Sequence, residues 1–205
     1  MRLPSFSLFY MLMSNSQIQH FKLFKPYGFI SQFVINGKQK RNKRLLGELY
    51  NFPKGTMAIG RLDEKSEGLL LLTTDGATST FITSSQIEKE YYVQVDGLIT
   101  PNAIQVLATG VLITVNSKPY LTKPSKVFVL EKTPNFPERG RKIRDARHGP
   151  TSWISITITE GKFRQVRKMT SAVGFPTLRL VRVRVGTITL ANLKMGEVER
   201  LKEIQ

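Results

Sequence analysis

A run of four leucines, Leu69 to Leu72, most constrains how this chain can fold. Such a short, uninterrupted apolar run is typical of a buried strand. The run follows a loop in which Asp63 lies between Gly60 and Gly68, two residues that allow the backbone to bend and to approach a ligand. A carboxylate on a loop that a buried strand supports is a common way to present a catalytic group, although most loop aspartates only cap turns.

Further strands and a few helices follow from the hydrophobic pattern. Isoleucine alternates with other residues over 153–159, as in a strand, and Val166, Met169 and Val173 form the apolar stripe of a helix that Gly174 ends. The predicted strands are 21–24, 57–59, 69–72, 90–95, 111–115, 126–130, 153–159 and 178–185, and the predicted helices are 45–49, 77–87, 101–109 and 162–173. Hairpin-like spacings between the strands favour an α+β fold with a mainly antiparallel, mixed sheet flanked by helices.

The balance of charge is strongly basic. The chain has 31 lysines and arginines against 15 acidic residues, a formal net charge of +16 over 205 residues. This excess favours a polyanionic partner: nucleic acid first, an acidic membrane surface second, with solubility alone as the plain alternative. We expect the loop 133–150 to contact nucleic-acid phosphates. Its cations are Arg139, Arg141, Lys142, Arg144 and Arg147.

Cysteine and histidine usage excludes several kinds of site. There is no cysteine, and only His20 and His148 are present, which excludes disulfides and argues against a zinc site. The zinc-dependent base deaminases are therefore disfavoured, and the composition suits the cytoplasm. The apolar segment 3–13 is too short to span a bilayer. We expect a disordered lead-in over residues 1–15, followed by a domain over residues 20–205 that forms one body or two sub-lobes.

The string from Gly60 to Thr73, GRLDEKSEGLLLLT, resembles the catalytic loop of the pseudouridine synthases. The similarity is to the branch that modifies ribosomal RNA and contains the A-type synthase of the small ribosomal RNA. It implies the pseudouridine synthase fold, with a catalytic cleft across the sheet, and Asp63 as the essential carboxylate. It also implies that Arg61 enters the space that the target uridine leaves when it flips out of the RNA.

The segment 160–169, EGKFRQVRKM, resembles the second signature of this family. The resemblance implies that Arg167 pairs with Asp63. It also implies that Arg164, as a neighbour on the same helix, and Lys168 contact RNA phosphates. For any single arginine of such a segment, the simpler alternative is a solvated helix face.

Two more segments resemble motifs of the same family. The segment KEYYV, residues 89–93, implies that Tyr91 stacks on the target base, with Tyr92 on the opposite face of the strand. The simpler alternative is that both tyrosines pack at the sheet surface. The segment KPYG, residues 25–28, resembles a mainly structural motif near the cleft. Its Lys25 is a candidate for a phosphate contact, and a plain turn is the simpler interpretation.

The implied reaction isomerises uridine to pseudouridine: the glycosidic bond from N1 is broken and the base is rejoined through C5. Neither a cofactor nor a metal is needed. Segments 150–153 and 173–180 resemble the E-type branch that modifies the large ribosomal RNA, which implies 23S RNA as the substrate, with 16S RNA or transfer RNA as alternatives. Too few residues precede Lys25 for the S4-type RNA-binding domain of many relatives, so we expect a monomer whose catalytic domain binds RNA by itself.

Two other classes of function stay open at this point. A non-catalytic RNA-binding protein would need the positive charge, but it would not need Asp63, Arg167 and Tyr91 together. A retaining glycosidase would need a second carboxylate close to Asp63. Glu64 and Glu67 are near in sequence, but both are more simply interpreted as solvated.

Overall fold

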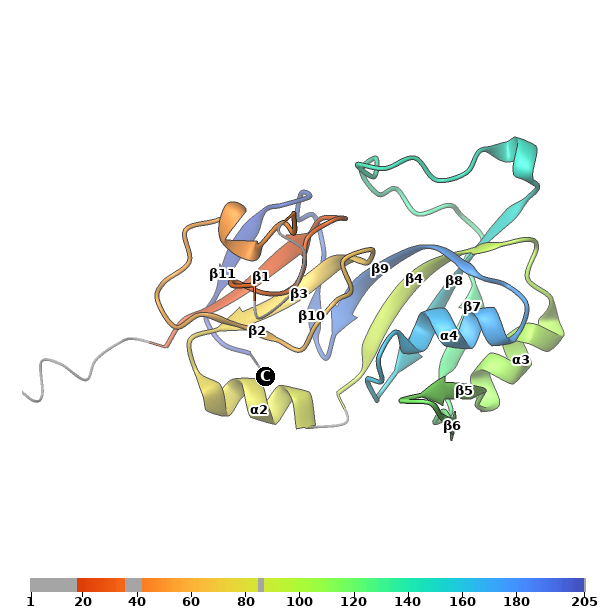
Figure 1. Cartoon of the computed structure of the whole chain (residues 1–205), viewed down its shortest axis with the longest axis horizontal. Helices are drawn as coiled ribbons and strands as arrows, with labels where there is room; N and C mark the ends of the chain where they lie inside the picture. The colour runs from red at the N-terminus through yellow and green to blue at the C-terminus, as the bar shows by residue number, and fades with distance from the viewer. Residues whose placement is uncertain (1–17, 36–41, 85–86, 205) are drawn as a thin grey trace, which may run out of the picture.

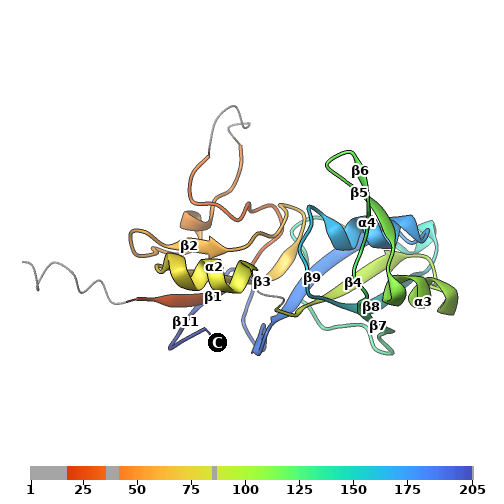
Figure 2. The same ribbon diagram turned by 90° about the horizontal axis from the view of Figure 1, so that it is seen from below.

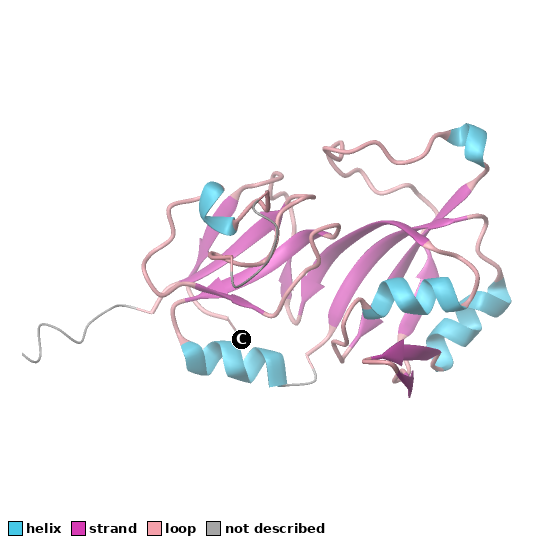
Figure 3. Ribbon diagram, in the orientation of Figure 1, coloured by secondary structure: helices cyan, strands magenta, loops and turns pink. Residues whose placement is uncertain are grey.

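The computed structural model describes residues 18–35, 42–84 and 87–204. The lead-in expected over residues 1–15 lies outside these ranges. Within them the α+β prediction is confirmed, because helices pack against one mixed, mainly antiparallel sheet of nine strands (Figures 1 and 3).

The elements follow one another along the chain with few long gaps. The strands are β1 (His20–Lys25), β2 (Met57–Ile59), β3 (Glu67–Thr73), β4 (Lys89–Asp96), β5 (Leu112–Val115), β6 (Lys118–Leu121), β7 (Lys126–Val129), β8 (Thr151–Ile158), β9 (Thr177–Val185), β10 (Ile188–Thr189) and β11 (Val198–Leu201). The helices are α2 (Gly76–Ser84), α3 (Pro101–Thr109) and α4 (Gln165–Ala172), with 3-10 turns at η1 (Leu46–Glu48) and η2 (Ala146–His148). The main sheet has the order β11-β1-β3-β9-β4-β8-β7, with β2 paired to β3 and β10 paired to β9.

A short parallel contact between β3 and β9 joins the two parts of this sheet. The strands pair at Glu67 with Val181 and at Gly68 with Arg182. Gly68 has a φ of +101°, and a Cβ at this position would lie 2.3 Å from the carbonyl oxygen of Arg182. Glycine is therefore required at this position, where β3 and β9 pair.

The leucine run lies in β3 and is buried on both faces, as predicted. Leu69 and Leu71 pack on one side with Phe24 and with Ile82 of α2. The alternate leucines of the run pack on the other side with Phe21 and Leu46. This double burial fixes β3, and with it the loop that precedes it, in the middle of the first part of the sheet.

The second part of the sheet is covered on one face by α3, α4 and the β5–β6 hairpin. Leu107 of α3, Ile113 of β5 and Met169 of α4 share one core with the isoleucines of β8. Figure 2 shows α4 and the hairpin on one side of these strands. On the opposite face, the ring of Phe136 packs against Tyr92, which confirms the orientation expected for that tyrosine.

Several element boundaries differ from the sequence-based expectation. Helix α4 begins at Gln165 and not at residue 162, because Arg164 adopts a left-handed backbone conformation with φ +53°. Helix α2 covers Gly76–Ser84, and residues 85–86 of the predicted helix lie outside the described residues. Strand β6 was not predicted, since it is short, carries a proline, and pairs with β5 through a two-residue turn at Asn116 and Ser117, both with positive φ. Strands β10 and β11 were also missed, because each is too short for a period to be visible.

Candidate active site

The loop between β2 and β3 is held on both sides of Asp63. Leu62 is buried, and its N–H and C=O groups both bond to the hydroxyl of Ser31 at 3.0 Å. The N–H of Gly28 donates to the carbonyl oxygen of Glu64 at 2.8 Å. These contacts fix the backbone and leave the Asp63 side chain 23% exposed.

Two arginines approach the same carboxylate oxygen of Asp63. Nη1 of Arg164 lies 3.5 Å from Oδ2, and Nε of Arg167 lies 3.8 Å from it. Arg167 is the more enclosed of the two, with 11% of its side chain exposed against 37% for Arg164. Its Nη2 donates to the carbonyl oxygen of Lys65 at 2.8 Å and to Oγ of Ser66 at 3.2 Å. Arg167 is therefore bonded to the loop that carries Asp63, and it meets the carboxylate itself as an ion pair.

The Nε of Arg167 is buried and has no hydrogen-bond partner among the described residues. Burial, together with the nearby charge of Arg164, lowers the pKa of Arg167 to about 10, although the charge of Asp63 opposes this shift. A shift of the Arg167 side chain toward Asp63 by about 0.5 Å would bring Nε into hydrogen-bond distance of Oδ2. Catalytic hydrogen bonds are often long in a free enzyme and shorten in its substrate complex.

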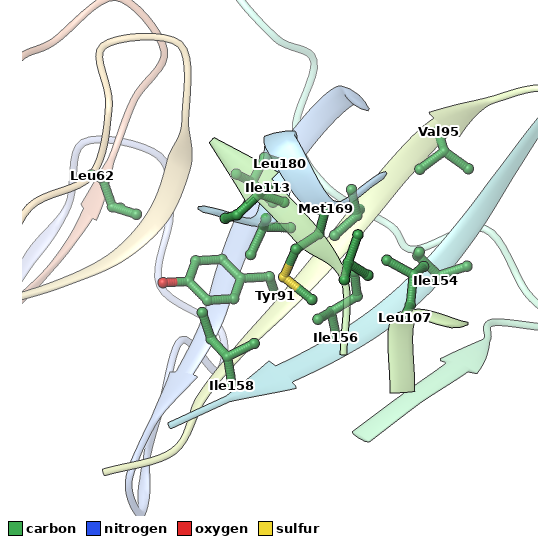
Figure 4. Close-up of a cluster of buried hydrophobic side chains, with 13 residues drawn as sticks. Leu62, Tyr91, Val95, Leu107, Ile113, Ile154, Ile156, Ile158, Met169 and Leu180 are labelled. Carbon is green, nitrogen blue, oxygen red and sulfur yellow. The ribbon is translucent and has the colours of Figure 1, made fainter. Parts of the chain in front are cut away.

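Asp63 faces a cavity of about 530 Å³, a volume within the usual range for small-molecule sites. The loop before β3, helix α2, strand β4 and the turn before α4 all contribute to its lining. Tyr91 of β4 is 9% exposed and lines the cavity with its ring. Figure 4 shows the Tyr91 hydroxyl pointing toward the side on which Leu62 lies. Tyr91 and Asp63 therefore line the same cavity.

The structure brings four of the nine predicted site residues to the lining of this cavity, and a fifth contacts one of them. Asp63, Tyr91, Arg61 and Arg164 line it, and Arg167 contacts Asp63 from behind. Arg61 is exposed, and its predicted role stays a prediction. Arg164 was expected on the helix; it lies before the first turn of α4, where it reaches Asp63 as a second cation.

Lys25 does not fit the role of a phosphate ligand. Its side chain is fully buried, and Nζ donates to the carbonyl oxygens of Pro26 at 2.9 Å and Phe29 at 2.6 Å. Burial lowers the pKa of Lys25 to about 7, although the charges of Glu67, Asp63 and Glu64 oppose the shift. A phosphate contact would require both hydrogen bonds to break. We therefore interpret Lys25 as a structural residue that stabilises the turn beside the catalytic loop.

Glu67 is also placed differently from expectation, because it is fully buried and not solvated. Its two carboxylate oxygens accept hydrogen bonds from Nε of Arg179 at 3.0 Å and from Nη2 at 2.8 Å. The same Nη2 donates to the carbonyl oxygen of Pro137 at 2.9 Å. This ion pair therefore connects β3 and β9 to the loop 133–150, called the basic loop from here on. Glu67 and Arg179 lie too far apart in sequence for a local pattern to predict that they pair.

The other predicted substrate-binding cations lie outside the cavity lining. Lys168 donates to the carbonyl oxygen of Thr114 at 2.7 Å. Arg144 forms an ion pair with Asp96 and donates to the carbonyl oxygen of Pro150 at 3.3 Å, so it holds the basic loop in shape. Arg141 is exposed. The basic loop also contacts the turn at residues 25–28, because Arg139 and Arg141 form hydrogen bonds with the Tyr27 hydroxyl. Burial raises the pKa of this hydroxyl, but the hydrogen bonds lower it overall.

A set of polar contacts at the far end of the cavity was not anticipated from the sequence. The Glu160 carboxylate accepts hydrogen bonds from the Tyr120 hydroxyl, from the N–H of Lys123 and from Nε2 of Gln165. Sequence motifs singled out the segment around Glu160, but they gave no sign that the unpredicted strand β6 would bring Tyr120 to it.

The described part of the chain contains neither a metal-binding cluster nor a membrane-spanning helix. Across residues 18–35, 42–84 and 87–204, no group of three or more histidine, aspartate or glutamate side chains could hold a metal ion. In the same ranges, no helix is long and apolar enough to cross a bilayer.

A single carboxylate flanked by two guanidinium groups, beside an aromatic ring in a half-open cavity, suits nucleophilic or proton-transfer chemistry on a planar group. The two cations stabilise the negative charge of the carboxylate by Coulombic attraction.

Comparisons with known proteins show the family to which the chain belongs. The family model described as RNA pseudouridylate synthase matches residues 19–172. The ribosomal large subunit pseudouridine synthase E of Xanthomonas campestris is 44% identical over 175 residues, which cover 84% of this chain and 90% of that protein. The enzyme of the same name from Vibrio parahaemolyticus is 43% identical over 183 residues, 88% of this chain and 71% of that protein. A crystal structure of a pseudouridylate synthase superposes with a TM-score of 0.72 at 28% identity, covering 91% of this chain and 71% of that one. The chain therefore belongs to the RNA pseudouridylate synthase family.

Proposed function

We propose that this protein converts one uridine of 23S ribosomal RNA to pseudouridine, acting in the cytoplasm as a monomer through a catalytic domain over residues 20–205. The observation that carries the proposal is the placement of Asp63, between two guanidinium groups and on the same cavity as Tyr91. The family match supports the reaction. The relatives that share more than two fifths of their residues with the chain carry the name of large-subunit synthases, which supports the RNA.

In the proposed reaction the bond from N1 of uracil to C1′ of the ribose breaks and a bond from C5 to C1′ forms; C5 loses its proton and N1 gains one, so the product is an isomer of uridine. Asp63 either attacks C1′, adds to C6 of the base, or removes a sugar proton. Each route starts from an ionised carboxylate, which Arg164 and Arg167 stabilise. Tyr91 stacks on the uracil while the base turns.

The cavity accepts a nucleotide and not a folded RNA, so the target uridine must leave its helix or loop first. We assign Arg61 to the space that this uridine leaves. It is exposed and lines the cavity two residues before Asp63, so it lies at the boundary between the bound nucleotide and the rest of the RNA. The net charge of +16 supplies the general attraction for RNA.

The experiment that tests this proposal maps pseudouridine by primer extension after carbodiimide treatment of 23S and 16S ribosomal RNA incubated with the protein. We expect one new stop in 23S RNA with the wild type. Asp63→Asn is expected to give no stop while its affinity for the RNA stays within about twofold, because the carboxylate reacts but contributes little to phosphate binding. Glu64→Gln is the matched control, since Glu64 is the next residue, is paired with Lys43 and does not line the cavity.

Each outcome discriminates. A stop in 16S RNA, or in transfer RNA tested in parallel, would show that the reaction is as proposed but that its substrate is a different RNA. Loss of RNA binding by a folded Asp63→Asn, at matched salt, would contradict a purely catalytic role for this residue. Tight, salt-sensitive binding without a stop in any of these RNAs would instead favour a non-catalytic RNA-binding protein.

A further inference from the structure

Phe163 is among the most exposed large hydrophobic side chains of the described residues, with 68% of its surface accessible. It lies in the turn between β8 and α4, one residue before the Arg164 that pairs with Asp63. Gly161, Lys162 and Arg164 all line the cavity, whereas Phe163 does not. Its ring is therefore exposed to solvent on a turn whose neighbouring residues line the cavity, and we call this position the rim.

The turn that carries Phe163 is held by hydrogen bonds at both ends. Gln165 is 3% exposed; its N–H donates to the carbonyl oxygen of Lys162 at 3.0 Å, and its Oε1 accepts from the N–H of Lys162 at 2.9 Å. Its Nε2 donates to Glu160 at 2.6 Å. The ring is thus presented by a preformed backbone, so little ordering entropy would be lost when a ligand covers it.

One cation lies close to this exposed ring, and two more are its neighbours in the chain. Nζ of Lys168 lies 5.4 Å from the centre of the Phe163 ring and is anchored on the carbonyl oxygen of Thr114. Lys162 and Arg164 flank it in the chain. Proteins that bind single-stranded nucleic acid combine these two features, an aromatic ring on which a base stacks and positive groups that follow the phosphates.

We infer that Phe163 is the stacking platform for an unpaired nucleobase next to the target uridine. This inference rests on the proposed function for the identity of the ligand as RNA. Tyr91 inside the cavity takes the target base, and Phe163 on the rim takes a neighbour, while Lys162, Arg164 and Lys168 contact the phosphates between and beside them. The chain then recognises an unstacked pair of nucleotides and not one flipped uridine alone.

The test compares two probes that carry the same phosphates: a fluorescein-labelled decauridylate and a decamer of the same length without bases. For the wild type we expect tighter binding of the decauridylate. In Phe163→Ala we expect affinity for the decauridylate to fall about tenfold, within the range for one base–aromatic stack, and affinity for the abasic decamer to stay unchanged. Phe163→Trp should retain the preference for bases, because it keeps a flat aromatic surface.

Phe128→Ala is the matched control, since Phe128 is 51% exposed but lies on β7, which contributes no residue to the cavity lining, whereas both chain neighbours of Phe163 line it. An equal loss for both probes in Phe163→Ala would overturn the inference, because it would show a change in the turn or its cations. Unchanged binding of both probes would overturn it as well, and would leave the ring free for a protein partner. Isomerisation of 23S RNA is scored separately on the same preparations, so failure of the proposed function does not obscure the binding ratio.

Discussion

At the scale of single residues, Arg167 and Arg164 share Asp63 but differ in what else they do. Arg167 is enclosed and bonded to Lys65 and Ser66 of the catalytic loop, whereas Arg164 is more than one third exposed. Removal of Arg167 therefore changes the position of the carboxylate as well as its charge balance. Removal of Arg164 takes away charge near the rim and leaves the loop in place.

We expect Arg167→Ala to lower kcat by about 100-fold or more, because small displacements of a catalytic group are this costly. Arg164→Ala should lower kcat by about tenfold or less and act mainly on KM. Single-turnover and steady-state kinetics on the same RNA measure both effects, with thermal melting to confirm that each variant is folded. Equal losses in kcat for the two variants would refute the division of roles.

Motifs of the sequence were sufficient to nominate Asp63, Arg167 and Tyr91, since each lies in a short string whose order along the chain is informative. They were insufficient for Glu67 and Lys25, whose roles depend on burial. A charged residue in a polar-looking stretch is expected to face water, and only the packing of β3 against β9 places Glu67 beside Arg179 without solvent. Long-range pairing of this kind leaves no local signal.

At the scale of elements, the short parallel pairing of β3 with β9 controls the site, because the catalytic loop enters β3 directly at this point. Three contacts hold the two strands together where they pair. They are the close backbone approach at Gly68, the buried ion pair of Glu67 and Arg179, and a hydrogen bond from Nε of Arg182 to the carbonyl oxygen of Leu69 at 2.7 Å. A change here moves the loop on one side and the wall of the cavity on the other.

Gly68→Ala is expected to lower the free energy of unfolding by about 2 kcal/mol or more. The added Cβ would meet backbone atoms of Arg182, and an L-residue with a φ of +101° is strained in any case. Urea unfolding followed by circular dichroism measures the change. Gly76→Ala is the control, because Gly76 begins α2 with open space around its Cβ and should be neutral or slightly stabilising. An unaltered midpoint for Gly68→Ala would show that the strands can separate without cost.

Secondary structure was predictable where periodicity was long or a cap was present. Helix α3 begins and ends as expected, since Thr100 accepts a hydrogen bond from the N–H of Ala103 and Pro101 occupies the first turn. The start of α4 was not predictable, because the backbone of Arg164 turns left-handed without a glycine or asparagine to indicate it. That deviation is what brings a second cation to Asp63.

At the scale of the whole molecule, much of the positive charge of the basic loop is already used to hold the protein together. Arg139 stacks on Tyr27 and donates to the carbonyl oxygen of Leu178, and Arg144 pairs with Asp96. Lys142 and Arg147 have 79% and 85% of their side chains exposed, and both are ion-paired only with Asp145 of the same loop among the described residues. These two are the ones we expect on RNA phosphates.

Lys142→Gln combined with Arg147→Gln should reduce the salt dependence of RNA binding. Each phosphate contact contributes a fixed amount to the slope of log affinity against log salt, so the double variant should be shallower by roughly 1 to 2. Titrations between about 50 and 300 mM salt measure the slope. Lys54→Gln combined with Lys202→Gln, two exposed lysines outside this loop, is the control. The same slope in both double variants would remove the loop from the RNA-binding surface.

The place of β11 in the sheet has a consequence for how the protein is made. This strand comes from residues 198–201, yet it pairs with β1, residues 20–25, and covers the edge of the first part of the sheet. Until a ribosome has released those late residues, β1 presents an open edge of unpaired backbone groups, which invites pairing with other chains. The edge of β1 is therefore sealed only after residues 198–201 have been made, and the nascent chain is prone to aggregate through that edge until then.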